Sequence, residues 1–194
     1  VQPSSTVIAP GAGYIVPTAH AAWMGPRLAL HGIEFRRLDH ATAAAETHAF
    51  RASKTTFGAS SVEGHQQLGV EGEWKPEPRE ITAGSLFVPI AQPKARLVIA
   101  LLEPQAPDSY AAWGEFNNAF ERKEYMEDYV AEAVAKAMLK NDPAVAAEFE
   151  KRLANDPEFA KNSAARLDFF ARQHASFDER YNLYPVLRMQ TAPE

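Results

Sequence analysis

Two carboxylates, Glu103 and Asp108, flank a proline-rich turn where they could face a cleft together. A general acid–base pair needs one carboxyl group whose pKa is raised by burial or by its neighbour. The same spacing fits a structural role in which Glu103 ends one helix and Asp108 caps the next. We favour the structural role and keep hydrolysis by these two acids, with or without a metal, as an open alternative.

A second pair, His31 and Glu34, has the spacing of metal ligands, and His174 is a conceivable third ligand. A zinc site needs three or four converging ligands. Gly32 and Ile33 look like a helix stop followed by a buried strand, so we expect His31 in a last helical turn, where a positive charge suits the carbonyl dipole. Cysteine is absent, and neither a Gly-x-Ser-x-Gly elbow nor a phosphate-binding glycine motif occurs. The sequence therefore predicts no catalytic residue, no metal and no cofactor.

Aromatic residues recur at helical spacing in the segment that follows the proline-rich turn. Asp108 or Ser109 can cap a helix over 109–121, and its aromatic positions are Tyr110, Trp113, Phe116 and Phe120. We expect this helix to pack in the core or against a neighbouring domain, and the alternative is a groove for a peptide or a glycan. The candidate residues of such a groove or interface are Glu103, Asp108, Tyr110 and Trp113.

The elements before this segment predict a sheet. The segments 13–20 (GYIVPTAH) and 85–92 (SLFVPIAQ) share the order strand, Val-Pro, helix. Between them, 45–57 and 65–75 favour two extended strands of a long hairpin. We predict the α+β class, with an antiparallel or mixed sheet and helices on one face, followed by a helical C-terminal half. The tail, 177–189, is expected to pack back on this body.

We assign a single domain, 1–194, with a β-rich part (1–104) and an α-helical part (105–194). The α-helical part repeats one start signal, because Asn-Asp-Pro occurs at 141–143 and again at 155–157. In each copy the aspartate can cap a helix and the proline can occupy its first position.

The composition excludes several classes of partner. The net charge of −5, without a long basic run, argues against nucleic acid and anionic membranes as partners. No apolar stretch approaches the roughly 20 residues that span a bilayer. The chain begins at Val1 and not at Met, so we expect a processed product or a piece of a longer protein.

One long ordered pattern carries a resemblance to a known family. It consists of VPIAQPKARLVIALLEPQAPDSYAAWGEFNNAFERKEYMEDY, the Asn-Asp-Pro helix starts, ARLDFFARQH and DERYNLYPV. This order resembles the region that follows the peptidase domain in large bacterial zinc carboxypeptidase-like proteins of the carboxypeptidase A type. The likeness extends from Gly13 to Val186.

The resemblance implies a non-catalytic C-terminal domain that packs on the peptidase domain of the same polypeptide or presents peptide or cell-wall substrate to it. It also implies a periplasmic or extracellular location. The family binds zinc through a His-x-x-Glu pair, which His31 and Glu34 match in spacing only, so no catalytic residue is carried over. The alternative function is a free-standing peptide- or glycan-binding module.

Overall fold

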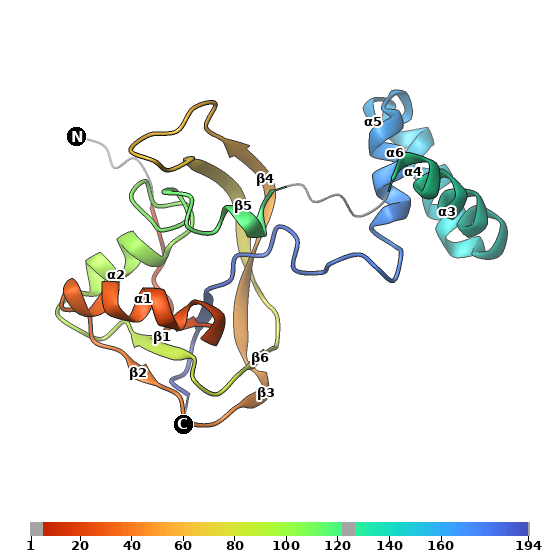
Figure 1. Ribbon diagram of the computed structural model, residues 1–194. Helices are drawn as coiled ribbons and strands as arrows, with labels where there is room; N and C mark the ends of the chain where they lie inside the picture. Colours follow the sequence, from red (N-terminus) through yellow and green to blue (C-terminus); the bar gives the residue numbers. More distant parts are fainter. Residues whose placement is uncertain (1–5, 122–126, 194) are drawn as a thin grey trace. The chain divides into compact units, whose positions relative to one another are not determined.

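The computed structural model describes residues 6–121 and 127–193. The chain forms two compact units, one from Val1–Glu121 together with Arg180–Glu194, and one from Arg122–Glu179 between them (Figure 1). We call them the sheet unit and the helical unit. This division differs from the single domain predicted from the sequence, with a β-rich part ending at 104, because the sheet unit continues to Glu121 and resumes at Arg180.

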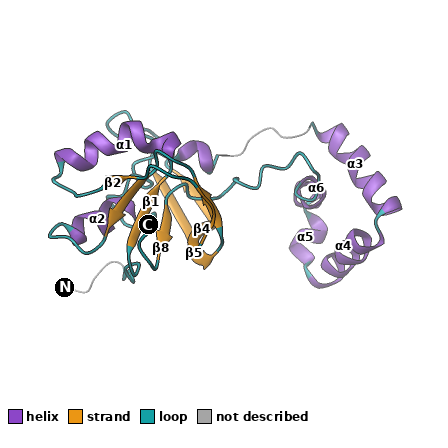
Figure 2. Cartoon of the chain, turned by 90° about the horizontal axis from the view of Figure 1, so that it is seen from below, coloured by secondary structure: helices purple, strands orange, loops and turns teal. Residues whose placement is uncertain are grey.

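The sheet unit is built on a six-stranded antiparallel sheet, so the expected α+β class is confirmed. The strand order is β2-β7-β1-β8-β4-β5, and Figure 2 shows most of these strands side by side. Their bounds are Arg36–Arg37 for β2, Leu86–Pro89 for β7, Gly13–Val16 for β1, Leu187–Met189 for β8, Thr47–Phe57 for β4 and Leu68–Pro76 for β5. The long hairpin expected between the two strand–helix segments is β4–β5.

The two similar segments form equivalent strand–helix steps. Strand β1 leads into α1 (Thr18–Leu30), and β7 leads into α2 (Ala95–Leu102). The strands pair antiparallel, with Tyr14 opposite Val88 and Val16 opposite Leu86. Because strand side chains alternate, these four residues share one face, and both helices pack on it through one hydrophobic cluster. The prediction of helices on a single face is thus confirmed.

The opposite face of the sheet is covered by a short β-ribbon in place of helices. A two-stranded ribbon of β3 (Thr42–Ala45) and β6 (Arg79–Ile81) lies there. Ala45 and Ile81 of the ribbon belong to one hydrophobic cluster with Ile15 and Phe87 of the sheet. The sheet is therefore buried on both faces at β1 and β7.

The C-terminal tail packs back on the body, as expected, and it does so as a strand. β8 lies between β1 and β4, with Leu187 opposite Ile15 and Met189 opposite both Gly13 and Thr47. The last strand in the sequence therefore connects the N-terminal strand to the long hairpin.

The helical unit contains four helices among its described residues: α3 (Asp128–Asn141), α4 (Pro143–Asn155), α5 (Pro157–Lys161) and α6 (Ser163–Ala171). Both Asn-Asp-Pro starts behave as predicted. The Asp142 carboxylate accepts the backbone N–H groups of Ala144 and Val145 at 3.0 and 3.1 Å, and Asp156 accepts that of Phe159 at 2.9 Å. The core of this unit includes Ala135, Phe159, Phe169 and Phe170.

The helical unit is inserted in the sequence of the sheet unit, between Glu121 and Arg180. The residues of the sheet unit on the two sides of the insertion are close in space. The Asn182 N–H donates to the Ala119 carbonyl oxygen at 2.9 Å. Within the described part of the chain, every helix is too short or too polar to span a bilayer.

Candidate functional site

The segment 103–121 is a series of tight turns and not the predicted helix. Its regular structure is limited to one 3-10 turn, Asn117–Ala119. Gly114 has φ of +80°, and the Asn117 side-chain amide donates to the Gln66 carbonyl at 2.9 Å. A left-handed residue interrupts an α-helix, and the contact with Gln66 holds the segment against the β4–β5 connection. Of the two cap candidates, Asp108 and Ser109, the Ser109 hydroxyl accepts a backbone N–H, that of Ala112 at 3.0 Å, but the bond stabilises a turn and not a helix.

The aromatic residues of this segment lie mostly inside the sheet unit. Tyr110, Phe116 and Phe120 are buried in the cluster beneath α1 and α2. The Trp23 ring meets those of Tyr110 and Phe116 with centroids 5.5 Å apart in each case. Trp113 is half-buried, with its centroid 6.0 Å from that of His65. These contacts agree with core packing, so the buried rings offer no surface to a partner.

Glu103 lies at the end of α2 in a closed polar network. Its Oε1 accepts from the Tyr14 hydroxyl at 2.6 Å and from Arg188 Nε at 2.8 Å, and its Oε2 accepts from Trp74 Nε1 at 3.1 Å. The Arg188 guanidinium also lies 4.4 Å from the centre of the Trp74 ring. Asp108, in contrast, is exposed. The two acids therefore lie in different environments, since Glu103 is buried and held by three donors.

Burial and the Glu103 charge raise the pKa of Tyr14 far above its ordinary value, so Tyr14 remains a donor. Glu103 and Arg188 are 3 % and 8 % exposed. A buried charge pair of this kind needs its remaining hydrogen-bonding capacity satisfied, and Tyr14 and Trp74 do this for the Glu103 carboxylate. The network fixes the end of α2 to strands β1, β5 and β8.

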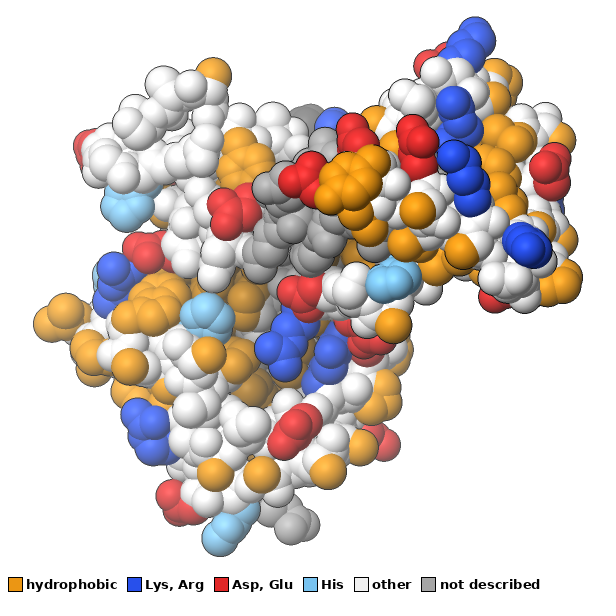
Figure 3. Space-filling view, turned by 45° about the vertical axis from the view of Figure 1, so that its right-hand side comes forward, with side chains coloured by type: hydrophobic (Ala, Val, Ile, Leu, Met, Phe, Trp, Pro, Cys, Tyr) orange, Lys and Arg blue, Asp and Glu red, His pale blue; other side chains and the backbone are white. Residues whose placement is uncertain are grey.

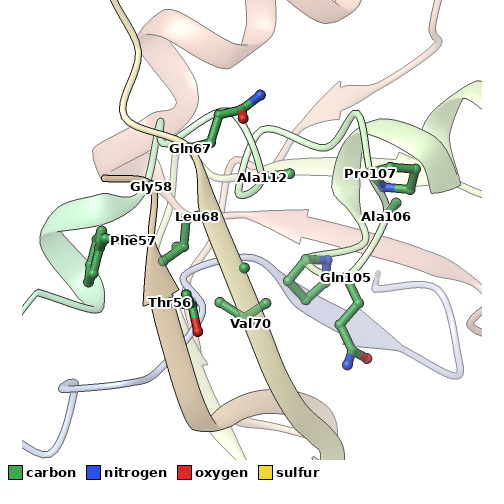
Figure 4. A pocket seen from close by; sticks show the side chains of 12 residues that line it. Thr56, Phe57, Gly58, Gln67, Leu68, Val70, Gln105, Ala106, Pro107 and Ala112 are labelled. Atoms are coloured by element: carbon green, nitrogen blue, oxygen red, sulfur yellow. The ribbon is translucent and has the colours of Figure 1, made fainter. Parts of the chain in front are cut away.

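A groove of about 440 Å³ lies next to this network (Figure 4). One wall is the end of the β4–β5 hairpin, and the other is the turn that follows Glu103. The lining residues are Thr56, Phe57, Gly58, Gln67, Leu68, Gly69, Val70, Pro104, Gln105, Ala106, Pro107 and Ala112. None of the four candidate residues, Glu103, Asp108, Tyr110 and Trp113, lines this groove, although Glu103 directly precedes Pro104 and Asp108 directly follows Pro107.

The groove follows an open edge of the sheet, because β5 is the end strand. The Leu68 N–H points away from β4 and donates to the Ala112 carbonyl at 3.0 Å, while Gly58 donates to the Gln67 carbonyl on the β4 side. Backbone groups alternate along an antiparallel strand, so the N–H and C=O of Val70 point the same way as the Leu68 N–H. Among the described residues, no other segment hydrogen-bonds to the Val70 main chain.

The opposite wall cannot pair regularly with this edge. Pro104 and Pro107 have no backbone N–H, so neither can donate to β5. Neither proline can therefore donate a hydrogen bond to the main chain of Val70.

The described residues contain no group of three or more His, Cys, Asp or Glu side chains that could hold a metal ion. His31 closes α1 and precedes Gly32 at φ +68°, while Glu34 lies beyond that turn. Figure 3 shows acidic and basic side chains mixed on the described residues of one face, without a continuous basic patch.

Comparison with protein-family models, with curated proteins and with solved structures found no match. The function is therefore inferred from the chemistry of the groove and from the order of sequence motifs.

Proposed function

We propose that this chain is a non-catalytic accessory domain that binds an extended stretch of peptide and presents it to a zinc carboxypeptidase-like domain of the same polypeptide. The supporting observation is the groove at the open edge of β5, where Val70 directs its N–H and C=O toward an occupant. The peptidase partner and the periplasmic or extracellular location come from the sequence resemblance alone.

The groove suits a peptide because strand addition uses the main chain of both partners. An extended peptide that lies beside an edge strand gains hydrogen bonds that do not depend on its sequence. Leu68 already donates one such bond to Ala112, so the edge geometry can accept a neighbouring chain. The apolar side chains in the walls, which include Leu68, Pro104 and Pro107, would shield these bonds in part from water.

A glycan has less support than a peptide. Tyr110 is buried, and Trp113 packs near His65, so neither is a free platform for a sugar ring. In the described part of the chain, the polar side chains that line the groove are those of Thr56, Gln67 and Gln105. A sugar offers many hydroxyl groups, and so few partners would leave most of them unsatisfied.

The first test is peptide binding with a blocked groove. Gln105 is exposed at the groove, and Gln105→Trp would fill it; Asn118→Trp makes the same change at an exposed position of the segment outside the lining. With a library of labelled peptides of about six residues, the length of a typical strand, fluorescence anisotropy should detect binding to the parent chain. We expect Gln105→Trp to weaken it about tenfold or more, a loss of about 1.4 kcal/mol. Equal affinities of the two variants would argue against this groove.

The second test separates an accessory domain from a free-standing module. The chain is added to the separately produced peptidase domain of the same polypeptide, and hydrolysis of a long and a short peptide is measured. We expect the added chain to raise the rate of hydrolysis of the long peptide but not of the short one, because only the long peptide can reach both the groove and the active site. If the two rates are unchanged while peptides still bind the groove, the free-standing alternative is favoured.

A further inference from the structure

Building on the proposed function, we infer that the groove takes an interior, uncharged segment of an extended peptide and recognises neither end of the peptide chain. Among the residues that the structure describes, the groove is lined by no Lys, Arg, Asp or Glu. Their polar groups are two side-chain amides, one threonine hydroxyl and the open main chain at Val70. All of these are neutral, and each suits a neutral partner.

Capture of a terminal carboxylate requires different groups. Proteins bind carboxylates with arginine, lysine or clustered backbone N–H groups. Here the proline wall lacks N–H groups at Pro104 and Pro107. The lining therefore offers a carboxylate neither a cation nor a row of donors.

The nearest buried charges do not change this conclusion. Glu103 directly precedes Pro104, but Tyr14, Trp74 and Arg188 occupy both of its oxygens. Arg188 is in turn neutralised by Glu103, with Nη2 at 2.6 Å from Oε1. The pair presents no net charge to the groove.

One exposed acid lies at the end of the wall. Asp108 follows Pro107 and is open to solvent, where its field is screened. Its sign would repel a terminal carboxylate and attract a terminal amine. The two ends of a test peptide must therefore be capped separately.

The experiment uses the full chain labelled with ¹⁵N and one peptide of about six residues, made only of Ser, Thr, Val and Gln. Four versions carry free ends, an acetylated N-terminus, an amidated C-terminus, or both caps. We expect all four to shift the amide signals of Leu68, Gly69 and Val70 with affinities within about twofold of one another, and raised salt to have no effect. Gln105→Trp should abolish these shifts, and Asn118→Trp should not.

Three results would overturn the inference, and they can be told apart. If amidation weakens binding about tenfold or more, a terminal carboxylate is recognised. The same loss on acetylation would show that Asp108 holds a terminal amine. In both cases the proposed peptide binding stands, and only the inference that the groove takes an interior segment is refuted. If no version shifts the β5 amides at millimolar concentration, the peptide-binding function is refuted together with the inference.

Discussion

The Glu103→Gln substitution should strongly destabilise the sheet unit. It keeps the volume of the side chain and an acceptor for the Tyr14 hydroxyl, so no cavity is created. It removes the charge that balances Arg188, which is 8 % exposed. Breaking a buried ion pair by removing one partner costs about 3–5 kcal/mol. Since domains are stable by about 5–15 kcal/mol, this loss is roughly a fifth or more of the usual total.

A second substitution shows whether the uncompensated charge causes this loss. Arg188→Met removes the guanidinium and retains apolar packing against Trp74. Replacing a whole buried ion pair is often close to neutral. We therefore expect the Glu103→Gln/Arg188→Met double variant to be more stable than Glu103→Gln alone, a coupling that a double-mutant cycle quantifies.

Tryptophan fluorescence during urea unfolding measures these changes in the sheet unit alone. All three tryptophans of the chain, Trp23, Trp74 and Trp113, belong to that unit. A loss below about 1 kcal/mol for Glu103→Gln would show that Arg188 finds water or another acceptor, and it would refute the argument from burial. Additive effects in the double variant would refute it independently.

Three further predictions concern a glycine, a histidine and the inserted unit. Gly114→Ala should lower the free energy of unfolding more than Gly64→Ala does. Both glycines have a positive φ, which costs a residue with a side chain about 1–2 kcal/mol, but only at Gly114 would the added Cβ overlap backbone atoms. Equal losses in urea unfolding would contradict this. Burial lowers the pKa of His20, so its contribution to stability is complete above its ordinary pKa of 6.5 and is lost as the pH falls through the folded-state value. His20→Asn, which keeps an acceptor for the Trp23 N–H, should therefore flatten the unfolding free energy between about pH 8 and about pH 5, and an unaltered slope would exclude this origin. Replacing 122–179 by a short Gly-Ser linker should preserve the fluorescence and cooperative unfolding of the sheet unit, because Ala119 and Asn182, close to the two cut points, are hydrogen-bonded to each other. Loss of cooperativity would show that the sheet unit needs the insertion.

The elements that the sequence predicted well are those set by neighbouring residues. Val16-Pro17 and Val88-Pro89 each mark the passage from strand toward helix, and Asp142 and Asp156 cap the helices that follow them. These features depend on local backbone geometry and on one side-chain oxygen, so the pattern of residues is sufficient to find them.

The elements that it missed depend on distant contacts. Tyr110, Trp113 and Phe116 have helical spacing, but Gly114 adopts a positive φ against the Gln66 carbonyl, far away in sequence. Leu187 shows no clear strand pattern, and its strand exists because β1 and β4 each offer an edge to it. Tertiary pairing overrides local preference at both places.

The candidate site depends both on residues close in sequence and on distant contacts. Glu103 was chosen for possible acid–base chemistry, but its oxygens are fully engaged by Tyr14, Trp74 and Arg188. Two of these partners lie in the first and last strands of the chain, while Trp74 lies in β5, the strand whose open edge forms the groove. The network therefore fixes the residue before Pro104 relative to that edge. A buried acid can thus set the width of the groove without lining it.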